Sequence, residues 1–212
     1  TSVGAGMGSF GRRQANGTLR LGGARYAGVF RGAYLQADND FPFVNRSVPG
    51  RPLVRQPNNR QQHADVQHYG VWRWRNGGTW RHAAWLHDSD RQIPPAMTEA
   101  PSATWQRDRA LRAVSSISVP TGARSHIQCR MAWLDESIAF HLRGQTDLSR
   151  SRTLVAHPEW VRTWRRVDVR LGAHAQRAEA RADGYAESER WFAQWRAAGY
   201  ASVRRRSREL AV

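Results

Sequence analysis

Residues 71–78 read VWRWRNGG and contain the clearest strand signal in this chain. From Trp72 to Arg75, apolar and basic side chains alternate, which is the period of a strand with two different faces. Trp72 and Trp74 are therefore expected on one face, and Arg73 and Arg75 on the other. The Asn-Gly-Gly that follows is typical of a turn. This stretch predicts a strand that ends in a tight turn.

The residues before this strand are rich first in glycine and then in proline. Half of the 18 glycines lie within residues 1–36, so we expect residues 1–16 to form a flexible N-terminus. Residues 18–35 combine an alternating run, a Gly-Gly pair and an aromatic segment, and they predict a small hairpin. Four prolines among polar residues between positions 41 and 62 predict an extended surface arm.

The last third of the chain carries patterns that favour helices. Pro158 stands where a first helical residue belongs, and Glu159 would complement the helix dipole. Apolar residues then recur at helical spacing. These are Trp160, Trp164, Val167 and Leu171, with a second stripe at Trp191, Phe192 and Trp195 that Gly199 would cap. Residues 136–143 predict a short helix, and residues 93–104 a polyproline-like connector.

Together these patterns predict an α+β protein: a small antiparallel sheet with extended irregular arms and a helical C-terminal extension. We expect three segments within the 212 residues. They are a flexible Gly-rich N-terminus at 1–16, a small domain with extended arms at 17–125, and a mainly helical, Arg- and Trp-rich extension at 126–212.

The charge balance predicts an anionic partner. All 33 basic residues are arginine, and against 17 carboxylates they leave a formal charge of +16. The absence of lysine is typical of a GC-rich genome, but it does not explain the surplus of positive charge. RNA, anionic lipid and acidic protein surfaces would all satisfy it.

Cysteine content and hydropathy give further expectations about the compartment. Cys129 is the single cysteine, which favours a reducing compartment such as the cytosol or the mitochondrial matrix. No apolar run approaches the roughly 18–20 residues of a transmembrane helix, so we expect a soluble or peripherally attached protein. The chain begins at Thr1 rather than Met, as a cleaved presequence would leave it.

Motifs that could carry chemistry are incomplete. Residues 6–11 match a dinucleotide-binding fingerprint by letters, but the expected strand, helix and acidic residue around it are missing. His126 with Cys129 falls short of the four ligands of a zinc site, and His82 with His87 has the wrong spacing for a helical pair. The neighbouring carboxylates of Asp135 and Glu136 would diverge. We expect no enzyme activity, no catalytic residues, no cofactor and no metal.

Arginine and tryptophan are interleaved at residues 72–75 and 164–166, a composition that can bind nucleic acid through phosphate contacts and base stacking. The alternative is an amphipathic element with tryptophan inward and arginine outward. The spacing favours the amphipathic element, because the indoles of each segment fall on a common face. Arg204, Arg205, Arg206 and Arg208 add a basic tail.

One segment resembles a known family. Residues 80–95 place Trp80 before a Trp85-Leu86-His87 triplet, followed by Asp90 and the Pro94-Pro95 pair. This order resembles the signature of the subunit-twelve (alpha subcomplex) family of mitochondrial NADH:ubiquinone oxidoreductase, complex I. Gly-Thr-Leu at 17–19, Tyr26, Trp-Gln-Arg at 105–107 and Thr-Gly at 121–122 resemble other elements of that family in the same order. The resemblance spans residues 17–125.

The resemblance implies a non-catalytic accessory subunit that braces the matrix peripheral arm of the respiratory complex. The expected partners are other complex I subunits, especially the iron-sulfur subunits between the NADH-oxidising and quinone modules, with anionic lipid as a further contact. The expected location is the matrix side of the mitochondrial inner membrane. The family motif, Trp80, Trp85, Leu86, His87, Asp90, Pro94 and Pro95, would then form the core and docking surface, with His87 and Asp90 hydrogen-bonded to each other.

A mitochondrial ribosomal protein is the alternative. The +16 charge and the basic tail predict binding to ribosomal RNA that weakens steeply with salt. The family that the motif resembles also includes a related assembly factor, which is a further alternative. An independent enzyme ranks behind all of these.

Overall fold

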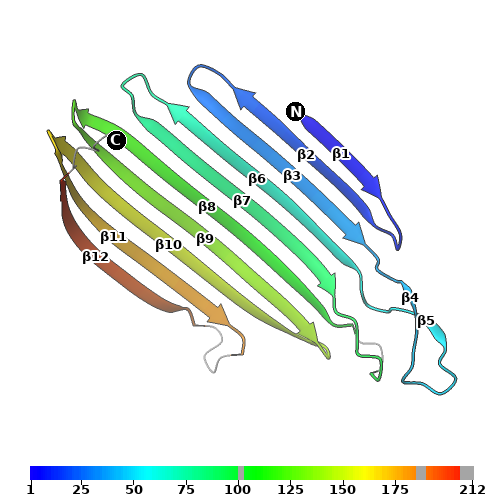
Figure 1. Cartoon of the computed structure of the whole chain (residues 1–212). Helices are drawn as coiled ribbons and strands as arrows, with labels where there is room; N and C mark the ends of the chain where they lie inside the picture. Colours follow the sequence, from blue (N-terminus) through cyan, green and yellow to red (C-terminus); the bar gives the residue numbers. More distant parts are fainter. Residues whose placement is uncertain (100–102, 185–189, 206–212) are drawn as a thin grey trace, which may run out of the picture.

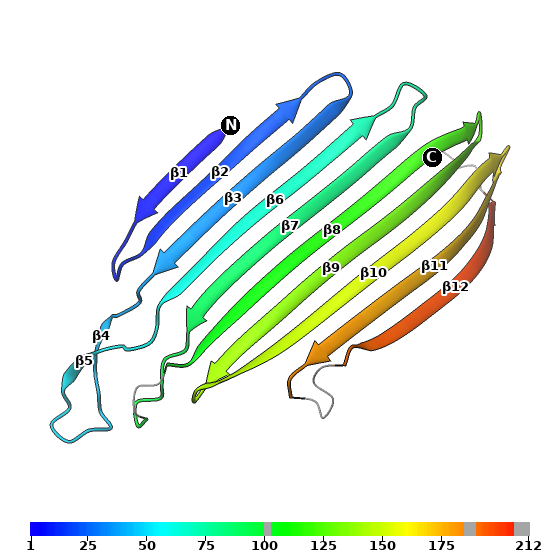
Figure 2. The ribbon, with the colours of Figure 1, turned by 180° about the vertical axis from the view of Figure 1, so that it is seen from behind.

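The computed structural model describes residues 1–99, 103–184 and 190–205. Ten strands form one antiparallel sheet in the order β1-β2-β3-β6-β7-β8-β9-β10-β11-β12, so each main strand pairs with the next along the chain (Figures 1 and 2). The strands are β1 Ser2–Met7, β2 Arg13–Gly22, β3 Tyr26–Ala37, β6 Gln61–Arg73, β7 Thr79–Gln92, β8 Trp105–Gly122, β9 Ser125–Leu142, β10 Gln145–Trp164, β11 Val167–Ala182 and β12 Phe192–Arg205. A separate pair, β4 Pro42–Val44 and β5 Leu53–Arg55, forms a small hairpin beside the sheet.

The two ends of the sheet differ in their connections. At the end drawn uppermost in Figure 1, short turns join β2 to β3, β6 to β7, β8 to β9 and β10 to β11. At the other end lie the longer segments between β3 and β6, between β7 and β8, and between β11 and β12. The β1–β2 turn and the two-residue turn between β9 and β10 also lie at this second end. We call the first end the short-turn end and the second, which holds all the longer segments, the long-loop end.

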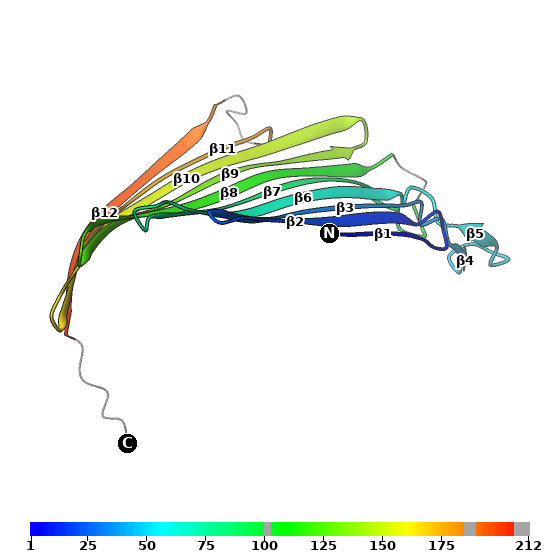
Figure 3. The ribbon, with the colours of Figure 1, turned by 90° about the horizontal axis from the view of Figure 1, so that it is seen from above.

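The sheet is curved and forms a single layer (Figure 3). Among the described residues, Ala37 and Val161 are the only buried hydrophobic side chains. The accessible surface is 15245 Å², whereas a compact monomer of this mass would expose about 10,000 Å². The strands account for 75% of the described residues, far above the roughly 20–25% of ordinary soluble domains. Within the described ranges, therefore, no second layer covers either face of this sheet in the way that buries the core of a two-layered domain.

The predicted hairpin is confirmed, and the predicted strand at residues 71–75 is confirmed in part. β2 and β3 pair in antiparallel register around the Gly-rich turn, from Gly22 opposite Ala27 to Arg13 opposite Gln36. Residues 71–73 end β6, but Trp74 lies in the turn, where its backbone N–H donates to the carbonyl of Gly78. The predicted surface arm at 41–62 contains the β4–β5 hairpin and the start of β6.

The predicted α+β class is wrong, because the described chain has no helix and the expected helical extension consists of strands. Trp160 and Trp164 lie on β10, and Val167 and Leu171 on β11, with a two-residue turn between them. A spacing of four residues keeps side chains on one face of a strand as well as of a helix. The turn at residues 165–166 separates the two strands. The helical spacing of the apolar residues across this turn therefore arises by coincidence.

Pro158 lies inside β10 rather than at the start of a helix. The pairing of β10 with β9 continues through Pro158, whereas the pairing with β11 is interrupted at His157 and Pro158. Proline has no N–H to donate, so a gap in the ladder is expected beside it.

The sheet also passes through the expected segment boundaries. Residues 1–16 include β1 and the start of β2, and β8 and β9 pair across residues 125 and 126. The predicted short helix at 136–143 falls on β9. Of the predicted connector at 93–104, residues 100–102 lie outside the described residues, as do Arg206 and Arg208 of the basic tail. Within the described part of the chain, no helix has the length and apolar character that a bilayer crossing requires.

Candidate functional site

The strand register fixes which residues share a face of the sheet. Residues directly opposite each other on neighbouring strands point to the same side. Trp72 on β6 is opposite both Tyr26 on β3 and Trp80 on β7, and the side that they share is called the apolar face. Tyr69 on β6 is opposite Ala83 on β7, and their side is called the polar face.

The apolar face carries a continuous apolar band. Alternate residues make up the band: Leu19 and Leu21 on β2; Tyr26, Gly28, Phe30 and Gly32 on β3; Ala64, Val66, His68, Gly70 and Trp72 on β6; Trp80, His82, Ala84 and Leu86 on β7; Leu111, Ala113, Ser115, Ile117 and Val119 on β8; Ile127, Cys129, Met131 and Trp133 on β9; Leu154, Ala156, Pro158, Trp160, Arg162 and Trp164 on β10; Val167, Val169, Leu171, Ala173 and Ala175 on β11; and Trp195, Ala197, Gly199, Ala201 and Val203 on β12. Arg162 is the only Asp, Glu or Arg among them. The intervening residues on the polar face include Asp65, Arg81, Arg112, Arg130, Glu159, Asp168, Arg170 and Arg196. One face is thus apolar and the other charged over the same stretch of sheet.

Aromatic rings border the apolar band on both sides. Tyr26, Trp72, Trp80, Trp160 and Trp164 lie toward the short-turn end, and Trp133 and Trp195 toward the long-loop end. Indole and phenol rings combine an apolar body with a polar tip and favour boundaries between apolar and aqueous surroundings. Arg162 fits the same boundary, because its guanidinium lies 5.6 Å from the ring centroid of Trp164.

The apolar band runs obliquely to the rows of paired residues. Toward the long-loop end, the band stops at Asp88 on β7, at Asp135 on β9 and at Arg177 on β11. Each of these residues lies one row of same-face residues closer to the short turns than the residue named before it. A band of constant height has this drift when the strands are tilted. From Leu154 to Trp164, β10 takes ten residue steps, about 33 Å of strand. At a tilt of about 40° this gives a band about 25 Å high.

Imidazole rings within the band take part in an aromatic ladder across three strands. His68 stacks on Phe30 with ring centroids 4.1 Å apart, and His82 lies 4.8 Å from His68 and 4.4 Å from Trp80. The hydroxyl of Tyr26 is 2.8 Å from Nε2 of His68. The imidazoles of His68 and His82, which are the most polar rings of the band, therefore have aromatic neighbours within the sheet.

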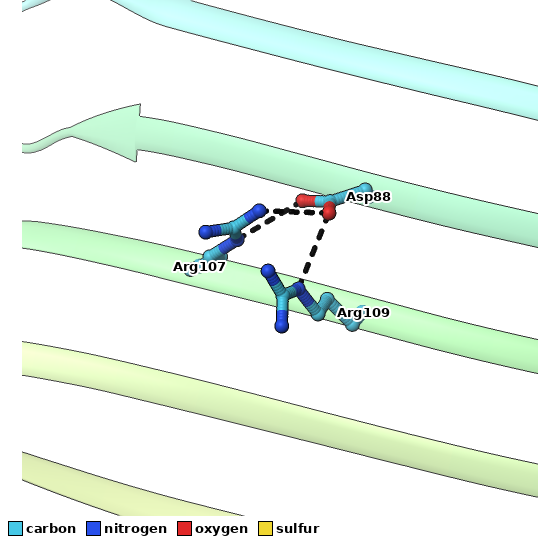
Figure 4. Close-up of polar contacts among 3 residues, drawn as sticks. All are labelled: Asp88, Arg107 and Arg109. Atoms are coloured by element: carbon cyan, nitrogen blue, oxygen red, sulfur yellow. Dashed lines mark hydrogen bonds and ion pairs between the residues drawn. The ribbon is translucent and has the colours of Figure 1, made fainter.

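A charged belt lies next to the band, toward the long-loop end of the apolar face; it consists of Asp88, Arg107, Arg109, Asp135, Arg150 and Arg152. Asp88 accepts two hydrogen bonds from Arg107, through Nε at 3.1 Å and NH2 at 2.9 Å, and one from Nε of Arg109 at 3.2 Å (Figure 4). The side-by-side bonds from Arg107 are the bidentate geometry that makes guanidinium–carboxylate pairs specific.

The same arrangement recurs two strands further along. Asp135 accepts two hydrogen bonds from Arg150, at 3.1 and 3.0 Å, and one from Nε of Arg152 at 3.2 Å. The hydrogen bonds from Arg150 lower the pKa of Asp135 below its ordinary 3.8, against a smaller opposing effect of burial. The pKa of Asp88 is lowered in the same way by Arg107. Both carboxylates are therefore ionised at neutral pH.

This pKa shift predicts a pH dependence of stability. Because both pKa values are lower in the folded chain, the two carboxylates stabilise the fold above about pH 4 and lose this contribution as the pH falls through their folded values. With Asp88 44% exposed, each pair should contribute only about 0.2–1 kcal/mol. In the intact protein, Asp88→Asn with Asp135→Asn should lower the free energy of unfolding at pH 7 and flatten its decline below pH 4. Equal declines in variant and wild type, measured by denaturant titration, would contradict this assignment.

The polar face holds hydrogen-bonded clusters beside open grooves. Asp65 accepts hydrogen bonds from Nε1 of Trp85 at 2.9 Å and faces Nδ1 of His87 at 2.8 Å. The guanidinium of Arg112 lies 4.7 Å from the Trp85 ring centroid and also binds Glu136. A groove of about 520 Å³ opens over Trp85 and Arg112. This face offers charged and hydrogen-bonding groups to water or to polar solutes.

The structure divides the family motif between the two faces. Trp80, Leu86 and Asp90 lie on the apolar face, and Trp85 and His87 on the polar face. Pro94 and Pro95 follow the end of β7. His87 and Asp90 lie on opposite faces, so the hydrogen bond expected between them is replaced by the contact of His87 with Asp65. The seven residues do not form one packed cluster.

The remaining sequence candidates are also separated. His126 and Cys129 lie on opposite faces, as do His82 and His87. Asp135 and Glu136 diverge as predicted, since the first binds Arg150 and the second binds Arg112 on the other side. Residues 6–11 form the end of β1 and the turn after it. In the described ranges, no group of three or more His, Cys, Asp and Glu residues is arranged to hold a metal ion.

Sequence reasoning missed both the apolar band and the charged belt. The signal was present as alternation in residues 111–119, where Leu, Ala, Ser, Ile and Val occupy every second position, and again in residues 127–133. The belt was readable as two Arg-x-Arg pairs, at 107–109 and 150–152. Recognising either needed the strand register, which brings each pair beside an aspartate of the preceding strand.

No protein-family model matches the sequence, and the comparison with curated proteins gives no match either.

Proposed function

We propose that this sheet is part of a membrane wall, with the apolar face against lipid acyl chains and the polar face lining an aqueous interior. The apolar band carries the proposal, because it is restricted to one face, bordered by aromatic rings and charged only at Arg162. In soluble sandwiches a second layer covers such a face. Here the face stays open, with Trp195 67% and Val203 73% exposed.

The dimensions of the band favour lipid over a covering protein layer. A strand crosses a bilayer with about 9–11 residues when it is tilted by about 45°. The band on β10, residues 154–164, has this length, and its oblique course supplies the tilt. At the tilt of about 40° that membrane strands adopt, the β10 part of the band would be about 25 Å high, which matches the apolar band of strands in a hydrocarbon layer.

Backbone hydrogen bonding sets a further requirement. In hydrocarbon, each N–H and C=O must find its partner within the protein. The eight interior strands of the sheet meet this requirement through neighbours on both sides, whereas β1 and β12 each have a neighbour on one side. The proposal therefore requires that both edges find strand partners, either each other or further strands, so that every backbone group in the hydrocarbon is paired.

The polar face suggests what such a wall would do. Arg31 and Arg112 line the 520 Å³ groove, and Arg81 and Arg130 line a second groove of about 370 Å³. Arginine in the lining of an aqueous path favours anionic solutes. We therefore propose that the polar face binds or passes polar solutes across the membrane, with a preference for anions.

Extraction with alkaline carbonate tests the membrane assignment. Carbonate at about pH 11 releases proteins that are attached to membrane surfaces and leaves embedded ones in the membrane pellet. We expect the intact protein to stay in the pellet after carbonate and to enter solution only with detergent. Its quantitative release by carbonate would contradict the proposal.

The accessory-subunit assignment, with its iron-sulfur partners and its place on the mitochondrial inner membrane, stays a prediction, and so does the ribosomal alternative. Their observable consequences differ from those of an embedded wall. A peripheral complex I subunit would be released by carbonate and would co-migrate with NADH-oxidising activity on a native gel. A ribosomal protein would leave its particle after nuclease treatment.

A further inference from the structure

The charged belt encloses a groove where the apolar band ends. Arg109 on β8 and Arg150 on β10 lie in the same row of paired residues, with Ser137 of β9 between them. A groove of about 630 Å³ is lined by these three residues, by the carboxylates of Asp88 and Asp135 that bind the arginines and, on its other side, by Leu86, Leu111 and Val66. The groove thus has a charged, hydrogen-bonding wall, in which the arginines are held by the aspartates, and an apolar wall.

The belt has more positive than negative charge. Four guanidinium groups share the two carboxylates of Asp88 and Asp135, and Asp90 lies opposite Arg107, so one positive charge is left over among these seven residues. Arg109 is 56% exposed and donates to Asp88 through Nε, which is the bond drawn from this side chain in Figure 4. Arg150 uses Nε and NH2 for Asp135, which leaves NH1 toward other partners.

We propose that the groove between Arg109 and Arg150 binds the phosphate of a membrane lipid headgroup. Its acyl chains would run along Leu86 and Leu111 into the apolar band. The inference rests on the proposed membrane wall, because only then does the belt lie at the depth of the headgroups.

The chemistry of the groove selects phosphate. Guanidinium groups present N–H donors in a planar fork that matches phosphate oxygens, and such charge-assisted bonds are stronger than neutral ones. The hydroxyl of Ser137 adds a donor between the two arginines. The two aspartates hold the arginines extended over the sheet, so a bound phosphate would meet groups that are already positioned.

Native mass spectrometry of the intact protein in detergent tests the proposal. The probes are phosphatidic acid and a diacylglycerol with the same acyl chains, which differ only in the phosphate. We expect phosphatidic acid to bind about tenfold more tightly than the diacylglycerol. The double variant Arg109→Gln with Arg150→Gln should lose about tenfold in affinity for phosphatidic acid. Arg109→Lys with Arg150→Lys should lose less, because the charge remains without the planar fork.

A matched control removes two arginines from the other face. Arg81→Gln with Arg130→Gln should leave the affinity for phosphatidic acid unchanged, since both side chains lie on the polar face. Equal binding of the two lipids, or an equal loss in this control, would overturn the proposal. Displacement of the lipid by millimolar inorganic phosphate would also overturn it, because the site would then take free phosphate.

Failure of this proposal can be told apart from failure of the membrane wall. If carbonate leaves the protein in the membrane but the glutamine variant binds phosphatidic acid as wild type does, only the lipid site fails. If carbonate releases the protein, the membrane wall fails, and the lipid site with it.

Discussion

Arginine in place of Ala84 is expected to lower the free energy of unfolding of the membrane-inserted protein by about 2–4 kcal/mol. Ala84 lies in the apolar band, in the same row as His68 and Ala113. A guanidinium there would face hydrocarbon and would have to reach the lipid–water boundary or draw water toward itself. Denaturant titration of the intact protein in phospholipid vesicles would measure the change.

Ala83 provides the matched control for this substitution. It is the preceding residue on β7, but it lies on the polar face beside Tyr69 and Val114. Ala83→Arg adds the same group to the same strand on the side that we propose to face water, so its effect should stay within about 0.5 kcal/mol. Equal destabilisation by the two substitutions would show that the faces do not differ in their surroundings.

Alanine in place of Gly70 is expected to destabilise the folded protein by about 1–3 kcal/mol. Gly70 is buried beneath the aromatic ladder of the apolar face. A methyl group at this position would lie 2.5 Å from Nε2 of His82 and 3.0 Å from the hydroxyl of Tyr26. His82 would have to leave the ring contacts that it makes with His68 and Trp80.

Gly17 on β2 offers the comparison, since a methyl group there would meet only a backbone oxygen at 3.8 Å. It lies on the same apolar face. Gly17→Ala should therefore be neutral or slightly stabilising. If both substitutions had the same effect on the unfolding free energy, the close packing over Gly70 would not be the cause.

Local turn chemistry made part of the fold predictable from the sequence. The glycine-rich turn after Gly22 and the Asn-Gly-Gly after Arg75 mark chain reversals, and strands flank both. The C-terminal half lacks such marks at one critical place. Its β10–β11 turn consists of two arginines, one of them, Arg165, at a φ of +50°. Without a glycine or proline there, the spacing of Trp160 and Trp164 fits a helix and a strand equally well.

The expectation of a soluble or peripheral protein came from a criterion for helices. A membrane helix needs a continuous apolar run, but a strand needs apolar residues only at every second position over about ten residues. Residues 127–133 show how this lowers the apparent hydropathy, because Gln128 and Arg130 alternate with Ile127, Cys129 and Met131. The structure also shows where part of the positive charge lies, because arginines are found on the polar face and in the charged belt. The anionic partner predicted from that charge stays a prediction.

The most direct test of the membrane wall uses Cys129, which lies in the apolar band on β9. A small fluorophore is attached to Cys129 in the intact protein in vesicles, and its quenching by lipids with nitroxide-labelled acyl chains is compared with quenching by iodide in water. The control is Cys129→Ala with Ala132→Cys, which moves the label to the polar face of the same strand. We predict strong lipid quenching and weak iodide quenching at position 129, with the reverse at position 132. Iodide quenching at position 129 without quenching by the lipid label would contradict the central claim that the apolar face contacts lipid.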